Sequence, residues 1–143
     1  MANSLKPWGP WISVAIWLAL VGWVSLTPDP PGYDWLVALS RRFSSPRTAL
    51  RAMQAILHVA LYGVGAILIA CAIPTIHSPI PAVRLFFLTL AVVMVVGIAF
   101  ELGQDYVPRR RADLWDLSGD LVGTVLFLGA AWAAGRPPFK RSR

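Results

Sequence analysis

Residues 85–102 read LFFLTLAVVMVVGIAFEL, an apolar run in which only Glu101 is charged. A helix needs about 20 predominantly apolar residues to cross a bilayer, so a run of this length and composition predicts a membrane span. Three further runs have the same character, at 8–26, 52–73 and 117–134. The sequence therefore predicts an all-α protein, an integral membrane four-helix bundle that forms one domain over residues 1–143.

The overall composition also favours a membrane protein over a soluble one. Apolar residues make up 57% of the chain and charged residues 14%, against about 45–50% and 25% in soluble domains. The net charge is +6, but no basic helix interleaved with aromatic residues lies outside the apolar runs, which argues against a nucleic-acid partner. We expect membrane lipids as partners, with anionic lipid as the counter-charge. The one cysteine, Cys71, excludes an internal disulfide and a cysteine-based zinc site.

The link between the first two runs contains a segment with helical character. Between residues 34 and 43, four apolar side chains fall on one helical face: Trp35, Leu36, Leu39 and Phe43. Asp34 at the start and Arg41 and Arg42 at the end suit the helix dipole. This pattern predicts a short helix lying in the membrane interface. An irregular loop is the alternative.

Charged residues fall into two sets if four spans place both termini on the same side. The side with the termini carries six basic residues and no acid: Lys6, Arg84, Arg136, Lys140, Arg141 and Arg143. The other side carries seven arginines and all seven acids, so the positive-inside rule barely distinguishes the two orientations. Arginines among that many acids are expected to pair locally, whereas the acid-free tail is free to meet anionic lipid. We therefore expect the plasma (inner) membrane, with both termini in the cytoplasm.

Polar residues form a stripe on each of the last three spans. In the second span, Arg51, Gln54, His58 and Tyr62 are spaced three, four and four apart, on one helical face. The other stripes are Glu101, Gln104 and Asp105 in the third span, and Asp113, Asp116 and Asp120 in the fourth. Because neighbouring spans run antiparallel, all three stripes lie at one membrane end, and we expect one buried polar cluster. Its predicted members are His58, Tyr62, Glu101, Gln104, Arg110, Arg111, Asp116 and Asp120.

Ionisable groups in a span are costly, on the order of 2.5 to 3.5 kcal/mol each near the centre. His58 and Asp120 lie one turn or more inside and bear the largest cost. Such groups persist where they pair, line a wet cavity or take part in function. We expect Arg110 or Arg111 to pair with a carboxylate of the cluster within about 4 Å. A purely structural role for His58 and Asp120 is the alternative.

The spacing of several polar residues carries a family resemblance. From Glu101, five residues follow at plus three, seven, nine, fifteen and twenty-two: Gln104, Pro108, Arg110, Asp116 and Gly123. Upstream, His58 precedes Tyr62 by four, and the first run closes on Ser25, Leu26, Thr27 and Pro28. This pattern resembles the VanZ-like membrane protein family over most of the chain.

The chain departs from that family at several positions. Asp120 stands where the family usually has Asn, and Arg109 where it has Gly. The family's Asp-Lys pair ahead of the histidine is Gln54 and Ala55 in this chain. The resemblance implies a membrane protein of the bacterial cell envelope with a polar site, and it supplies no biochemical mechanism.

Three specific chemistries are open to the cluster. The histidine and the carboxylates could surround a hard or borderline cation, but the adjacent arginine run disfavours a metal, and we predict none. Hydrolysis is possible with Glu101 or Asp116 as base and Arg110 holding an anionic group. His58 could also ligate a pigment, although His77 lies at the opposite membrane side and a paired-histidine haem is not expected. We therefore expect no cofactor and favour a non-enzymatic function.

Two functions of different classes fit these observations. In the first, the cluster of a small envelope protein binds an anionic head group through Arg110 and Arg111, and its other residues shape the pocket. In the second, the chain is a non-catalytic accessory or assembly subunit of a larger membrane protein complex. The cluster then only locks the bundle, and exposed Trp and Phe side chains contact a partner.

A cysteine engineered after Lys140, in a Cys71→Ser background, tests the orientation. We expect a membrane-impermeant thiol reagent to leave it unlabelled in intact cells and to label it after permeabilisation, because the tail is cytoplasmic. Labelling in intact cells would show the opposite orientation.

Overall fold

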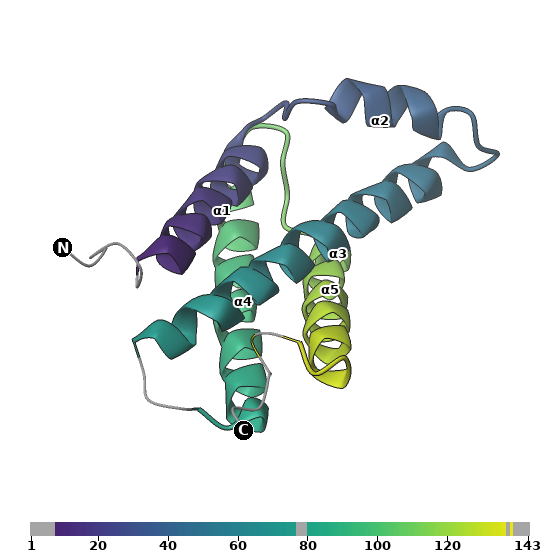
Figure 1. The fold of residues 1–143 in the computed structure, drawn as a ribbon. Helices are drawn as coiled ribbons and strands as arrows, with labels where there is room; N and C mark the ends of the chain where they lie inside the picture. Colours follow the sequence, from purple (N-terminus) through teal and green to yellow (C-terminus); the bar gives the residue numbers. More distant parts are fainter. Residues whose placement is uncertain (1–7, 77–79, 137, 139–143) are drawn as a thin grey trace.

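The computed structural model describes residues 8–76, 80–136 and 138 and places no strand in them. Its elements are α1 (Gly9–Leu26), α2 (Tyr33–Ser40), α3 (Pro46–Ala72), the 3-10 helix η1 (Ile73–Thr75), α4 (Ala82–Gln104) and α5 (Leu114–Ala133). α1, α3 with η1, α4 and α5 are each long and apolar enough to cross a membrane. The predicted all-α fold with four spans is confirmed (Figure 1).

The outer faces of the four long helices are apolar, as contact with lipid requires. Each helix has exposed large apolar side chains, and Ile16, Ile56 and Val95 among them are about two-thirds exposed. A soluble monomer rarely leaves such extended apolar surfaces in water. The chain is accordingly a membrane protein.

α3 begins six residues earlier than the predicted start near Ala52. Pro46 takes the first helical position, where its fixed φ suits a helix and its missing N–H is not needed. A helix of 27 residues is about 40 Å long, longer than the roughly 30 Å hydrocarbon core. The predicted start was based on where the apolar run begins. The first turns of α3 are polar, so the helix extends beyond that run.

α5 and α4 are also longer than predicted at the end that carries the cluster. α5 starts at Leu114 because the Asp113 side chain accepts a hydrogen bond from the Trp115 amide at 3.0 Å, which caps the helix. α4 continues to Gln104, so Glu101 and Gln104 lie on regular helix. The predicted ends had been placed at Leu102 and Leu117.

The short helix between the first two spans is present as α2, and the loop alternative is wrong. α2 begins after Gly32, whose φ of +85° is a left-handed conformation that glycine adopts easily. It ends at Ser40, so Phe43 lies in the turns that follow rather than on the helical face predicted for it. α2 lies at the end of the bundle where α1 ends and α3 begins (Figure 1).

The antiparallel arrangement follows from two contacts at the end of the bundle where α1 and α4 begin and α3 and α5 end. Trp11 near the start of α1 donates a hydrogen bond to Thr75 after the end of α3, and Phe86 on α4 contacts Trp132 on α5. In the core, the Trp17 indole donates to the Leu61 carbonyl at 2.9 Å and meets the Tyr62 ring edge-on. The opposite end of the bundle therefore gathers the end of α1, the end of α4 and the start of α5.

α3 and α5 make the most extensive helix pair, and glycines allow their close approach. A Cβ on Gly123 would collide with the Val59 carbonyl oxygen and lie 2.7 Å from Val59 Cα. A Cβ on Gly119 would lie 3.0 Å from the Ala55 carbonyl oxygen. Since backbone atoms cannot move aside as a flexible side chain can, position 123 on α5 requires glycine, and a Cβ at position 119 would fit only if α3 and α5 moved slightly apart. Small residues at helix interfaces serve this purpose in membranes.

Gly123→Ala tests this close approach, with Gly129→Ala on the same helix as its control. Gly123→Ala should destabilise the protein by about 1–3 kcal/mol, the usual cost of overpacking. Gly129→Ala should be neutral or slightly stabilising, because nothing lies within 4 Å of its added Cβ and alanine favours helix. Thermal melting of both variants in detergent measures the difference. Equal melting temperatures would contradict the close approach.

Candidate functional site

The centre of the polar cluster is a contact between His58 on α3 and Asp120 on α5. The distance between His58 Nδ1 and Asp120 Oδ1 is 2.7 Å, and the Asp120 side chain is fully buried. The Tyr62 ring lies parallel to the imidazole, with the ring centroids 5.7 Å apart. Within the spans, then, the predicted stripes of α3 and α5 meet.

Glycine on α4 makes room for the second oxygen of Asp120. Asp120 Oδ2 lies 2.7 Å from the position that a Gly97 Cβ would occupy. This oxygen is buried and has no hydrogen-bond partner among the described residues. A buried carboxylate oxygen without a partner is unusual in a native protein and calls for a physical explanation.

Glu101 connects the end of α4 to the start of α5. Its Oε1 accepts from the Gln104 amide at 3.1 Å, and its Oε2 accepts from the backbone N–H of Asp113 at 2.9 Å. Glu101 and Gln104 are both buried. The carboxylate is thus held by one donor from its own helix and one from the residue that precedes α5, and no arginine of the described chain forms an ion pair with it.

Asp116 completes the cluster on the side of the cavity. Its Oδ2 lies 3.7 Å from His58 Nε2, the ring nitrogen that faces away from Asp120. One ligand-type atom from each of His58, Glu101 and Asp116 can be chosen so that all three lie within 4.8 Å of one another. These three residues are the set in the described chain whose geometry could hold a metal ion.

The prediction that Arg110 or Arg111 pairs with Glu101, Asp116 or Asp120 is wrong. No such ion pair occurs among the described residues, whose pairs join His58 to Asp116 and Asp120, and Arg109 to Asp29. Arg110 instead donates from Nε to the Thr27 carbonyl at 3.1 Å and from Nη2 to the Val24 carbonyl at 2.9 Å.

The reason lies in the prolines that end α1. The Val24 carbonyl would receive the N–H of residue 28 if the helix continued, and the Thr27 carbonyl that of residue 31, but both residues are prolines without an N–H. Arg110 supplies the missing donors. Two segments quoted for the VanZ-like resemblance, the end of the first run and the arginine after α4, are therefore in direct contact.

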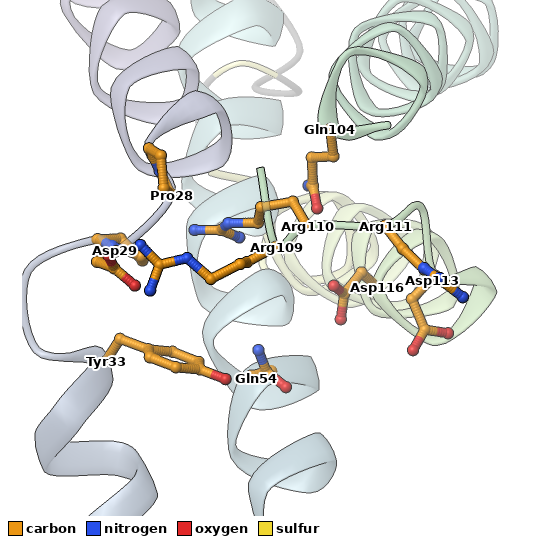
Figure 2. A pocket seen from close by; sticks show the side chains of 11 residues that line it. Pro28, Asp29, Tyr33, Gln54, Gln104, Arg109, Arg110, Arg111, Asp113 and Asp116 are labelled. Carbon is orange, nitrogen blue, oxygen red and sulfur yellow. Dashed lines mark ion pairs between the residues drawn. The ribbon is translucent and has the colours of Figure 1, made fainter. Parts of the chain in front are cut away.

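A cavity of about 320 Å³ opens beside the cluster, between the α1–α2 link, α3, the α4–α5 loop and the start of α5. Its lining residues are Pro28, Asp29, Pro30, Tyr33, Gln54, Gln104, Arg109, Arg110, Arg111, Asp113 and Asp116. Figure 2 shows Arg109 and Arg110 reaching toward the end of α1, while Asp116 lies on the opposite side, on α5. Arg109 and Arg110 thus lie on one side of the cavity, and Arg111 lies on the other side with Asp113 and Asp116 (Figure 2).

The structure brings together six of the eight predicted cluster residues. They are His58, Tyr62, Glu101, Gln104, Asp116 and Asp120. Arg110 and Arg111 lie on the cavity instead, and Arg51 is exposed away from it. Sequence reasoning did not include Tyr33 of α2 or the exposed Arg109–Asp29 pair in the site. The prolines after α1 were the available signal for Arg110, because they mark carbonyls without partners.

No protein-family model, curated protein or solved structure matches this chain. The VanZ-like assignment therefore stays a prediction that rests on the motif residues of the sequence.

Arg110→Gln and Arg109→Gln separate a helix-capping arginine from a surface one. Arg110→Gln should destabilise the protein by roughly 1.5–3 kcal/mol, because it weakens charge-assisted hydrogen bonds to carbonyls without other donors. Arg109→Gln should cost less than about 1 kcal/mol, since the Arg109 and Asp29 side chains are 74% and 62% exposed. Denaturation of both variants in detergent measures the two costs. A larger cost at Arg109 would refute the capping role of Arg110.

Proposed function

We propose that the chain is a VanZ-like membrane protein of the bacterial cell envelope that binds an anionic head group in its cavity. The observation that carries the proposal is the placement of three successive arginines, Arg109, Arg110 and Arg111, on one cavity at one end of the spans. Arginine offers a planar fork of donors that matches phosphate and carboxylate groups. The proposed orientation places this end of the bundle outside the plasma membrane.

The three arginines that line the cavity retain N–H donors for a ligand. The two hydrogen bonds from Arg110 to α1 use two of the five N–H donors of its guanidinium. The Arg109 pair with Asp29 is exposed, so a ligand can replace it at little cost. Arg111 takes part in none of the ion pairs of the described residues. Its side chain runs toward Asp113 (Figure 2) and lines the cavity, where an anion can contact its guanidinium.

Cavity size and helix surfaces favour a lipid-like ligand whose head group alone is enclosed. A volume of about 320 Å³ lies at the lower end of the range for small-molecule pockets. The acyl chains of such a ligand would lie against the apolar outer faces of the spans. Because Asp29, Asp113 and Asp116 line the same cavity, specific arginine contacts rather than net charge would select the anion.

Arg111→Gln tests the proposal, with Arg51→Gln as the matched control. Arg51 is exposed on α3 near the same end of the bundle and does not line the cavity, so both variants remove one positive charge. We expect Arg111→Gln to reduce the retention of anionic phospholipid about tenfold or more, the effect of losing one charge-assisted contact. Arg51→Gln should retain lipid as the wild type does. Native mass spectrometry of protein purified in mild detergent provides the measurement.

Arg111→Lys adds a test of geometry, because lysine keeps the charge and loses the fork. Its retention of anionic phospholipid should be lower than that of the wild type and higher than that of Arg111→Gln. Equal lipid retention by all four proteins would contradict the proposal. It would leave the accessory-subunit function, in which the cluster only locks the bundle and the protein copurifies with a larger complex.

A further inference from the structure

We infer that His58, Glu101 and Asp116 form a site for one divalent cation of borderline character, of the Zn²⁺ or Mn²⁺ class. The site offers one imidazole nitrogen and two carboxylate oxygens. Imidazole suits Zn²⁺ and related ions, and carboxylates suit Mn²⁺ and also bind Zn²⁺. Three protein ligands leave at least one coordination position open, which is typical of sites that also bind a substrate or water.

Asp120 prepares His58 for this role. His58 Nδ1 lies 2.7 Å from Asp120 Oδ1, and we assign the proton of this contact to Nδ1, the arrangement in which an ionised Asp120 accepts the hydrogen bond. The lone pair of the ring is then on Nε2, which is the nitrogen that faces Asp116 at 3.7 Å. A carboxylate that orients a histidine in this way is the usual partner of a metal-binding imidazole. Asp120 is thus a positioning residue and not a ligand.

The charges of the cluster also favour a cation. Three carboxylates surround one histidine, and Asp120 Oδ2 is buried without a partner among the described residues. The arginine run close to the cluster in sequence argues against a metal, but in the structure Arg110 donates to the Val24 and Thr27 carbonyls and Arg109 pairs with Asp29. No arginine of the described chain forms an ion pair with Glu101, Asp116 or Asp120. A divalent ion would supply the missing positive charge.

Only a small adjustment is needed to bind the ion. Ligands about 2.0–2.2 Å from a tetrahedral Zn²⁺ stand roughly 3.4 Å apart, whereas the three candidate atoms lie within 4.8 Å of one another. The Asp116 side chain is 16% exposed and lines the cavity. Its carboxylate therefore has room to rotate toward His58 and Glu101. Because Asp116 lines the cavity, the cavity would give an ion a path to the site.

Zinc binding by the full-length, tag-free protein tests this inference, with Asp116→Asn and Asp113→Asn as a matched pair. Both variants remove one carboxylate from the same cavity wall, and asparagine preserves the helix cap at residue 113. After chelator treatment in detergent, we expect the wild type and Asp113→Asn to take up one Zn²⁺ per chain and to melt at a higher temperature with Zn²⁺. Asp116→Asn should bind Zn²⁺ at least tenfold more weakly. Elemental analysis measures the zinc content, thermal melting the stabilisation and isothermal titration calorimetry the affinity, and Mn²⁺ serves as a second probe.

If Asp116→Asn does not fold, X-ray absorption provides a second test. The spectrum of the zinc-loaded His77→Gln protein identifies the atoms bound to the zinc. The chain has two histidines, so an imidazole signal in this variant can come only from His58. We expect one imidazole and otherwise oxygen ligands. The inference is overturned if the wild type takes up neither Zn²⁺ nor Mn²⁺, if Asp116→Asn and Asp113→Asn bind equally, or if the zinc shows no imidazole. These measurements use no lipid, so they succeed or fail independently of the head-group proposal.

Discussion

The absence of side chains at Gly119 and Gly123 is the constraint on which the polar cluster depends. Gly119 immediately precedes Asp120, and the position that its Cβ would occupy lies 3.0 Å from His58 Cβ. A larger residue at either glycine would push α5 away from α3. His58 and Asp120 would then face each other across a gap with no water inside the spans to fill it, at the cost that unpaired polar groups carry in lipid. Close packing of two backbones is thus what makes a buried acid in the bundle tolerable.

Each further group of the cluster is placed by the one before it. The Asp120 carboxylate orients the imidazole, and the imidazole presents its second nitrogen to Asp116. Gly97 on α4 leaves the space into which Asp120 Oδ2 projects, and Glu101, one turn further along α4, is held by donors from both neighbouring segments. The site is therefore built on regular helices, with the α4–α5 loop as its wall. That arrangement fixes side chains more tightly than a site made of loops alone.

The spans and the polar stripes could be predicted from the sequence because both follow simple periodicities. Apolar length identifies a span, and spacings of three and four residues identify a helical face, so His58, Glu101 and Asp120 could be assigned to one end of the bundle before any contact was known. The partners of Arg110 could not be predicted in this way. Arg110 lies on a loop, where no period sets the direction of a side chain. The start of α3 was missed for a related reason, since its first turns are polar and the apolar run begins later.

The Arg110 contact with α1 has a consequence for the order in which the membrane protein assembles. Its hydrogen bonds to the Thr27 and Val24 carbonyls join residues 83 and 86 positions apart. During synthesis from the N-terminus, α1 enters the bilayer long before the α4–α5 loop has been made. Until then, only water at the membrane surface can satisfy those two carbonyls, and the end of α1 has no fixed neighbour there. Trp11 and Trp17 can hold most of α1 against α3 earlier, so it is the end of the first helix, and not the whole helix, that is fixed only after Arg110 has been made.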